Sequence, residues 1–128
     1  GILSIAAAKL GVREIRSIDN DPLAVKICSE NTETNGVASQ IPTTDEPLQA
    51  GSQTFELVLA NIIAPVLIQL AKDVATAIKP GGTLILSGML ESQVNAVKEA
   101  YSRENAALHW VDEQSEGEWH ALTATLPN

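Results

Sequence analysis

The sequence predicts an α/β fold with a doubly wound, mainly parallel sheet and an antiparallel hairpin at its carboxyl end. Short apolar runs typical of strands alternate with helical patterns of ten or more residues, and this order requires crossovers between parallel strands. The carboxyl-terminal residues instead contain two strand-like runs around a polar turn. The length of 128 residues, with 45% hydrophobic and 19% charged residues, indicates one globular domain.

The first expected element is a helix over residues 1–10. Gly1 leads directly into strong helix formers, and Gly11 follows where a helix-terminating glycine is expected. A helix that starts at a bare glycine, with no strand before it, is typical of an internal position in a fold. We therefore expect the fold to lack its first strand within residues 1–128 and further sequence to precede Gly1.

A strand and a helix come next. Residues 14–18 alternate as in a short strand that ends at Asp19, and Pro22 favours the start of a helix over 22–35. Apolar residues at helical spacing predict the packed face of this helix. They are Leu23, Ala24, Ile27 and Cys28.

Residues 37–54 are weakly patterned, with a short strand expected near 39–42 and then a polar loop, Thr43–Gly51. The almost entirely apolar run Phe55–Ala60 predicts a central strand covered on both faces, and it stops at Asn61. An apolar stripe from Pro65 to Ile78 predicts one continuous helix.

The turn Lys79–Gly82 ends that helix, and Thr83–Ser87 predicts another buried strand, broken at Gly88. Apolar residues at helical spacing then predict a shorter helix. They are Val94, Val97 and Tyr101. The terminal hairpin is expected to pair 106–112, with Trp110 in the core, and 119–126 around the polar turn Glu113–Gly117.

Charge and composition exclude several classes of function. A formal net charge of −8 opposes direct binding to nucleic acid or to a membrane surface and favours a cationic partner, unless it serves only solubility. No apolar run is long enough to cross a bilayer. The single Cys28 and the lack of a signal peptide predict a cytoplasmic protein, and the sequence leaves its oligomeric state open.

Chemistry is expected just past the carboxyl ends of the strands, where open α/β sheets bind ligands. Asp19, Asn61 and the Ser87–Gly88 pair occupy these positions. A carboxylate at the position of Asp19 can accept hydrogen bonds from both ribose hydroxyls, although a loop acid or a helix cap would look the same. His109 and His120 have no partners at metal-ligand spacing, so we expect no metal.

Six segments, spread over nearly the whole chain, carry a resemblance to a known family. They are Gly1–Gly11, Ile18–Val25, Ala60–Leu67, Lys79–Gly82, Leu86–Gly88 and Glu116–Trp119. In this order they resemble the catalytic domain of the bacterial ribosomal protein L11 methyltransferase (PrmA) family. The Asp-Pro-Leu-Ala and Lys-Pro-Gly-Gly motifs occur across methyltransferases that use S-adenosylmethionine. The Asn-Ile-Ile-Ala and Glu-Gly-Glu-Trp segments are more specific to this family.

The resemblance implies a Rossmann-like domain, of which residues 1–128 form a part, and S-adenosylmethionine as the cofactor. By this resemblance Gly1 is the last glycine of the nucleotide loop, Asp19 binds the ribose, and Asn61 lies at the cofactor and the reacting methyl group. The expected reaction is methylation of amino groups, on lysine side chains or an N-terminal amine, of a basic ribosomal protein. The first strand, its terminal acid, the earlier loop glycines and the family's substrate-binding domain are absent from residues 1–128, so the fragment is expected to be inactive or weak alone.

Smaller expectations and alternatives remain. Asn61 could instead cap the helix that follows it, Trp119 could line the site, and Thr44 and Asp45 could border the adenine. No aromatic residue follows Asn61, which favours an aliphatic amine over adenine or glutamine as the methyl acceptor. A methyltransferase acting on another protein or a small molecule, and a noncatalytic remnant that acts by association, are the competing hypotheses.

Overall fold

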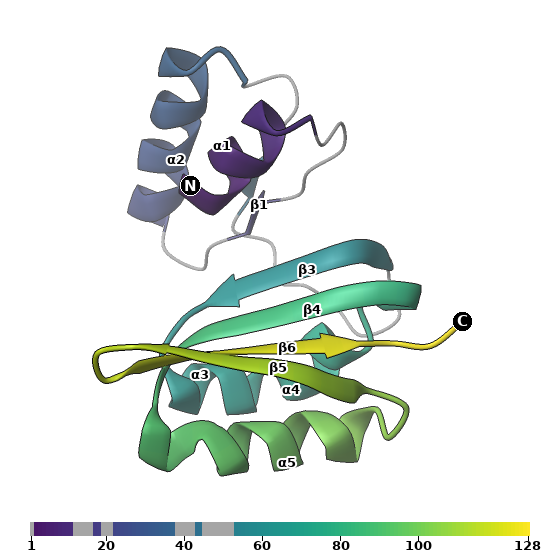
Figure 1. Ribbon diagram of the computed structural model, residues 1–128. Helices are drawn as coiled ribbons and strands as arrows, with labels where there is room; N and C mark the ends of the chain where they lie inside the picture. Colours follow the sequence, from purple (N-terminus) through teal and green to yellow (C-terminus); the bar gives the residue numbers. More distant parts are fainter. Residues whose placement is uncertain (1, 12–16, 19–21, 38–42, 45–52) are drawn as a thin grey trace. The chain divides into compact units, whose positions relative to one another are not determined.

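The computed structural model describes residues 2–11, 17–18, 22–37, 43–44 and 53–128. They divide into two units, Gly1–Leu48 and Gln49–Asn128, which are treated separately below (Figure 1). Gly1, Asp19 and Asp45, the strand expected at 39–42 and most of the one expected at 14–18 lie outside the described residues. None of the described helices is long and apolar enough to span a membrane.

The first unit contains two helices and a pair of short parallel strands. The elements are α1 (Ile2–Lys9), β1 (Ser17–Ile18), α2 (Pro22–Thr34) and β2 (Thr43–Thr44). β1 and β2 pair in parallel, as expected for strands joined by a helical crossover. The pairing corrects one prediction, because Thr43 and Thr44 form a strand rather than the beginning of a loop.

Glycines end both helices of this unit. Gly36 has a φ of 72° and donates its N–H to the carbonyl of Glu33, while Val37 donates to the carbonyl of Thr32. These two bonds form the C-terminal Schellman motif, which a glycine adopts without steric cost. The predicted end of the helix near residue 35 is therefore confirmed.

The buried side of α2 differs from the predicted one. Cys28 is buried as expected, and Thr32, one turn further along, is buried with it. Leu23 and Ile27 are exposed instead. Residues four apart share a helix face, so the buried face of α2 contains Cys28 and Thr32. The adjacent face, which contains Leu23 and Ile27, is exposed.

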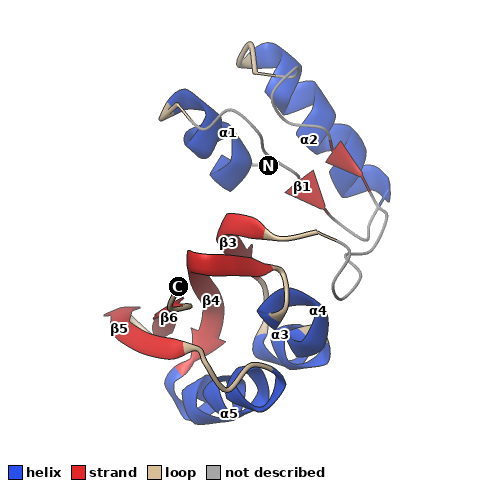
Figure 2. Cartoon of the chain, turned by 90° about the vertical axis from the view of Figure 1, so that its right-hand side faces the viewer, coloured by secondary structure: helices blue, strands red, loops and turns tan. Residues whose placement is uncertain are grey.

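The second unit is a four-stranded sheet with helices on one face. Its strands are β3 (Phe55–Asn61), β4 (Ile78–Leu90), β5 (His109–Glu116) and β6 (Trp119–Thr125). Their order is β3-β4-β6-β5, with β3 and β4 parallel and the other neighbours antiparallel. Helices α3 (Ala64–Gln69), α4 (Ala71–Ala75) and α5 (Val94–Glu104) lie on the same side of the sheet in Figures 1 and 2.

The single helix predicted from Pro65 to Ile78 is two helices. The chain leaves helical geometry at Leu70, with φ −91° and ψ 4°, and α4 then ends at Ala75. Ile78 belongs to β4, because Phe55 donates its N–H to the carbonyl of Ala77 and pairs with Ile78. Strand pairing therefore overrides the helical spacing at the end of the apolar stripe.

Other strand limits also differ from the prediction. The Lys79–Gly82 segment lies within β4, and β4 continues through Gly88 to Leu90. Residues Glu113 to Glu116 extend β5, which leaves only Gly117 and Glu118 as the hairpin turn. Gly117 has a φ of 60°, as required at the first central position of a type II′ hairpin.

β3 is the first strand in the order of this four-stranded sheet. Among the described strands it pairs only with β4. Leu57 and Leu59, on the face away from the helices, are 43% and 37% exposed. The apolar sequence of β3 is typical of a strand buried on both faces, but the described structure buries only the face toward the helices.

The core of the second unit lies between the sheet and the three helices. Its largest fully buried side chains are Leu67, Leu84, Leu86, Met89, Val97, Tyr101 and Leu122. Full burial of a leucine-sized side chain contributes about 1.5–3 kcal/mol. Val97 and Tyr101 confirm the buried face predicted for α5, with Val94 beside them.

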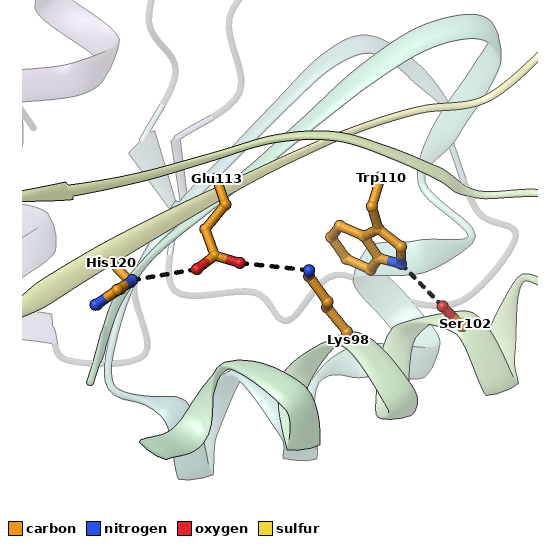
Figure 3. A network of polar contacts seen from close by, with 5 residues as sticks. All are labelled: Lys98, Ser102, Trp110, Glu113 and His120. Atoms are coloured by element: carbon orange, nitrogen blue, oxygen red, sulfur yellow. Dashed lines mark hydrogen bonds and ion pairs between the residues drawn. The ribbon is translucent and has the colours of Figure 1, made fainter. Parts of the chain in front are cut away.

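Polar contacts join the terminal hairpin to α5 (Figure 3). The indole Nε1 of Trp110 donates to Oγ of Ser102 over 3.0 Å. The carboxylate of Glu113 lies 3.4 Å from Nζ of Lys98 and 3.5 Å from Nδ1 of His120. Trp110 is thus partly buried and hydrogen-bonded, which fixes the hairpin against the helix.

Candidate functional site

Asn61 is the last residue of β3 and lies at the carboxyl end of the parallel β3–β4 pair. It pairs with Ser87 of β4, and the next residue, Ile62, donates its N–H to the carbonyl of Ser87 over 3.1 Å. The sequence predicted that Asn61 and Ser87–Gly88 end neighbouring strands, and the structure brings them together. This edge is where α/β sheets bind ligands.

The side chain of Asn61 is free to meet a ligand. Asn61 is exposed, and its amide makes no hydrogen bond within the part of the chain that the structure describes. The following helix α3 begins after Ile63 and has no side-chain cap. The alternative role of Asn61 as a cap of that helix is therefore not realised, and its carbonyl and amino groups stay available.

Gly88 brings the backbone of β4 against the end of β3. Its φ is 95°, and the register between β4 and β6 shifts between Ser87 and Met89, which is a β-bulge. A Cβ at Gly88 would lie 2.5 Å from the carbonyl oxygen of Ile62 and 3.1 Å from Oδ1 of Asn61. The sequence placed Gly88 at a strand end but missed this approach; a glycine inside a strand pattern is the signal that could have indicated it.

Apolar side chains are exposed around this end of the sheet. Ile63 is 60% exposed and lies two residues beyond Asn61. Trp119 is 51% exposed. It is the first residue of β6 and pairs with Leu90, the last residue of β4, just past the bulge. The indole of Trp119 is thus at the same end of the sheet as Asn61, where the sequence suggested it could line the site.

No metal centre is visible among the residues described. Groups of three or more His, Cys, Asp or Glu side chains arranged to hold an ion are absent from that part of the chain. His109 is exposed, while His120 packs beside Glu113 within the hairpin. Of the three residues predicted to hold the cofactor, Asn61 is described, whereas Gly1 and Asp19 are not.

Comparison with protein families gives a match over almost the entire chain. Residues 1–127 match the family "Ribosomal protein L11 methyltransferase (PrmA)". The curated ribosomal protein L11 methyltransferase of Chloroflexus aurantiacus is 38% identical over 152 aligned residues, covering 99% of this chain and 46% of that protein. Those of Citrifermentans bemidjiense and Geobacter sulfurreducens are 40% and 43% identical, and this chain spans 40% of the length of each.

Solved structures have the same fold. A ribosomal protein L11 methylase from Lactobacillus delbrueckii subsp. bulgaricus has a TM-score of 0.89 at 26% identity, covering 100% of this chain and 66% of that one. An RNA methyltransferase from Salinibacter ruber in complex with S-adenosyl-L-homocysteine has a TM-score of 0.73 at 19% identity, covering 99% of this chain and 74% of that one. These structures confirm the predicted α/β fold class. The chain belongs to the ribosomal protein L11 methyltransferase (PrmA) family.

Proposed function

We propose that this chain is part of the catalytic domain of an S-adenosylmethionine-dependent methyltransferase whose substrate is ribosomal protein L11. The observation that carries the proposal is the family match over residues 1–127. It is supported by the exposed, unpaired amide of Asn61 at the ligand-binding edge of the sheet. The chain spans less than half the length of its curated relatives, so the activity is proposed for the full-length polypeptide.

The proposed acceptors are aliphatic amino groups, on lysine side chains or at an N-terminus. S-adenosylmethionine, when bound, supplies a methyl group on a sulfonium. A lysine amine has a pKa of about 10.4 in water and must lose a proton before it can attack, which desolvation in an apolar site favours. Ile63, exposed beside Asn61, contributes apolar surface of this kind.

Asn61 is proposed to orient the acceptor. Its Oδ1 can accept a hydrogen bond from the neutral amine and so direct the nitrogen lone pair at the methyl carbon, while the proton shed earlier goes to solvent. Residues 62–64, which follow it, are aliphatic and offer no ring on which a planar amide or base could stack. An aliphatic amine therefore suits this end of the sheet better than adenine or glutamine.

Cofactor binding is proposed to involve Gly1, Asp19 and Asn61, with Asp19 accepting hydrogen bonds from the ribose. Asn61 is compatible with this role because it is exposed at a strand end next to a glycine. The net charge of −8 suits a basic protein substrate and opposes direct contact with nucleic acid or an anionic membrane. A ribosomal protein substrate also implies that the enzyme works in the cytoplasm.

The test measures methyl transfer to purified ribosomal protein L11 by the full-length polypeptide that carries residues 1–128. Radiolabelled S-adenosylmethionine reports the transfer, and peptide mass spectrometry locates the methylated nitrogen. We expect Asn61→Ala to lower kcat by about 100-fold, the loss that misplacement of reacting groups produces. Calorimetry with S-adenosylhomocysteine should show binding that Asp19→Ala weakens at least tenfold.

Gln69→Ala is the control for the loss of an exposed side-chain amide, because Gln69 lies at the end of α3 that is farther along the chain from Asn61. It should leave both measurements unchanged. Binding of S-adenosylhomocysteine without methylation of ribosomal protein L11 would favour a methyltransferase with another substrate. A folded full-length protein that binds no S-adenosylhomocysteine would contradict the proposal and favour a noncatalytic remnant.

A further inference from the structure

The end of β3 is held between two parts of β4. On one side, the N–H of Ile62 donates to the carbonyl of Ser87 over 3.1 Å. On the other, the carbonyl of Ile62 and Oδ1 of Asn61 face the Cα of Gly88. One peptide unit and one side-chain amide are therefore packed against consecutive residues of the neighbouring strand.

Only a glycine permits this packing. A Cβ at Gly88 would lie 2.5 Å from the Ile62 oxygen and 2.9 Å from the Ile62 carbonyl carbon, distances that Cβ atoms do not tolerate. Both atoms belong to backbone, so no side-chain rotation relieves the contact. The φ of 95° is also unfavourable for any L-residue with a side chain.

We propose that Gly88 is a positioning residue that acts through Asn61. Its lack of a side chain lets the β4 bulge close on the end of β3 and holds the Asn61 amide where the methyl acceptor is to be oriented. This inference deepens the proposed function and rests on it. Bulges next to active sites commonly direct a side chain in this way.

The proposal predicts a specific kinetic defect. In Gly88→Ala, the added methyl group displaces Ile62 and with it Asn61. We expect kcat for methylation of ribosomal protein L11 to fall about 100-fold at saturating substrate and cofactor, since a displacement of about 1 Å can have this effect. The KM for the protein substrate should change much less, because the bulk of the substrate contacts is left in place.

A double-mutant cycle separates positioning from general damage. If Gly88 acts through Asn61, then Gly88→Ala should lower the residual single-turnover rate of Asn61→Ala by less than about threefold. A further loss of tenfold or more in that background would overturn the proposal. So would a Gly88→Ala enzyme as active as the wild type.

Gly81→Ala is the control for backbone strain. Gly81 lies in the same strand with a φ of 82°, but the three atoms nearest to a Cβ there all belong to the flexible side chain of Asn128. We expect the kcat of Gly81→Ala to stay within about threefold of the wild-type value. A loss equal to that of Gly88→Ala would mean that strain in β4 alone is responsible, and the proposal would be wrong.

A measurement on the unmutated protein covers the case in which Gly88→Ala does not fold. The side-chain amide of Asn61, identified by its absence from the NMR spectrum of Asn61→Ala, should have an order parameter above about 0.6, the value below which a group is flexible. A value below about 0.6 would contradict the proposal. If the wild type methylates nothing, the proposed function fails, but this amide still reports whether Asn61 is held in place.

Discussion

The phenol of Tyr101 in α5 donates a hydrogen bond of 2.9 Å to the backbone carbonyl of Leu67 in α3. Both side chains are fully buried, and 34 residues of sequence separate them. The bond joins the helix before the terminal hairpin to the helix that follows Asn61. It therefore stabilises the segment from which the proposed catalytic amide projects.

Tyr101→Phe should destabilise the protein without emptying the core. The ring keeps its packing, but the Leu67 carbonyl loses a buried donor, so the free energy of unfolding should fall by about 0.5–1.5 kcal/mol. Urea unfolding measures the change. Phe55→Leu is a control for altered aromatic packing, because Phe55 is half-buried and takes no part in the hydrogen bond. A loss above about 3 kcal/mol in Tyr101→Phe would show that more than this bond is broken.

The same residue predicts a loss of stability at alkaline pH. Burial raises the pKa of the Tyr101 phenol well above its ordinary value near 10. Above pH 10 the unfolded chain therefore releases the phenol proton while the folded chain retains it, and stability falls as pH rises. The slope for one proton is about 1.4 kcal/mol per pH unit.

The check compares urea unfolding of wild type and Tyr101→Phe from pH 8 to pH 11. The wild type should lose the additional stability above pH 10, and the variant should lack this component. Tyr101 is the only tyrosine in residues 1–128, so tyrosinate absorbance of this chain reports its ionisation directly. Equal slopes for the two proteins, or ionisation of the folded chain near pH 10, would contradict the assignment.

The spacing of apolar residues predicted the fold wherever the buried residues follow the helical or strand period of a single element. Val94, Val97 and Tyr101 recur at helical spacing and are buried on one face of α5. The prediction failed where strand pairing competes with that period, as at Ile78, which fits the helical stripe but pairs with Phe55. It also failed for the polar residues of β5, because an exposed edge strand needs no apolar alternation.

The candidate site was predictable only in part. The rule that ligands bind at strand ends selects Asn61 and Gly88 from the sequence, and the structure places them in contact. A glycine inside a strand pattern could have indicated a close approach at Gly88, but the role proposed for it depends on where the backbone of residue 62 meets β4. A single sequence does not contain that distance.

The contact between Lys98 and Glu113 should contribute little to stability. The two side chains are 33% and 41% exposed, so solvent screens their charges at the 3.4 Å separation. A double-mutant cycle with Lys98→Met and Glu113→Gln should give a coupling below about 1 kcal/mol, and less at 1 M salt, where the Debye length is about 3 Å. A coupling above about 2 kcal/mol that does not change with salt would contradict this prediction. It would show that Lys98, Glu113 and His120, which lies at the other carboxylate oxygen, act together as a buried network.

The exposed leucines of β3 predict self-association of the 128-residue chain when it is expressed alone. Leu57 and Leu59 are 43% and 37% exposed and lie on the same face of the strand, and an exposed apolar patch favours association. Leu59→Lys should therefore lower the average mass measured by light scattering. Ile68→Lys removes a comparably exposed apolar side chain from α3 and should leave the mass unchanged. A monomeric wild-type chain, or an equal effect of both substitutions, would show that this face of β3 is not the associating surface.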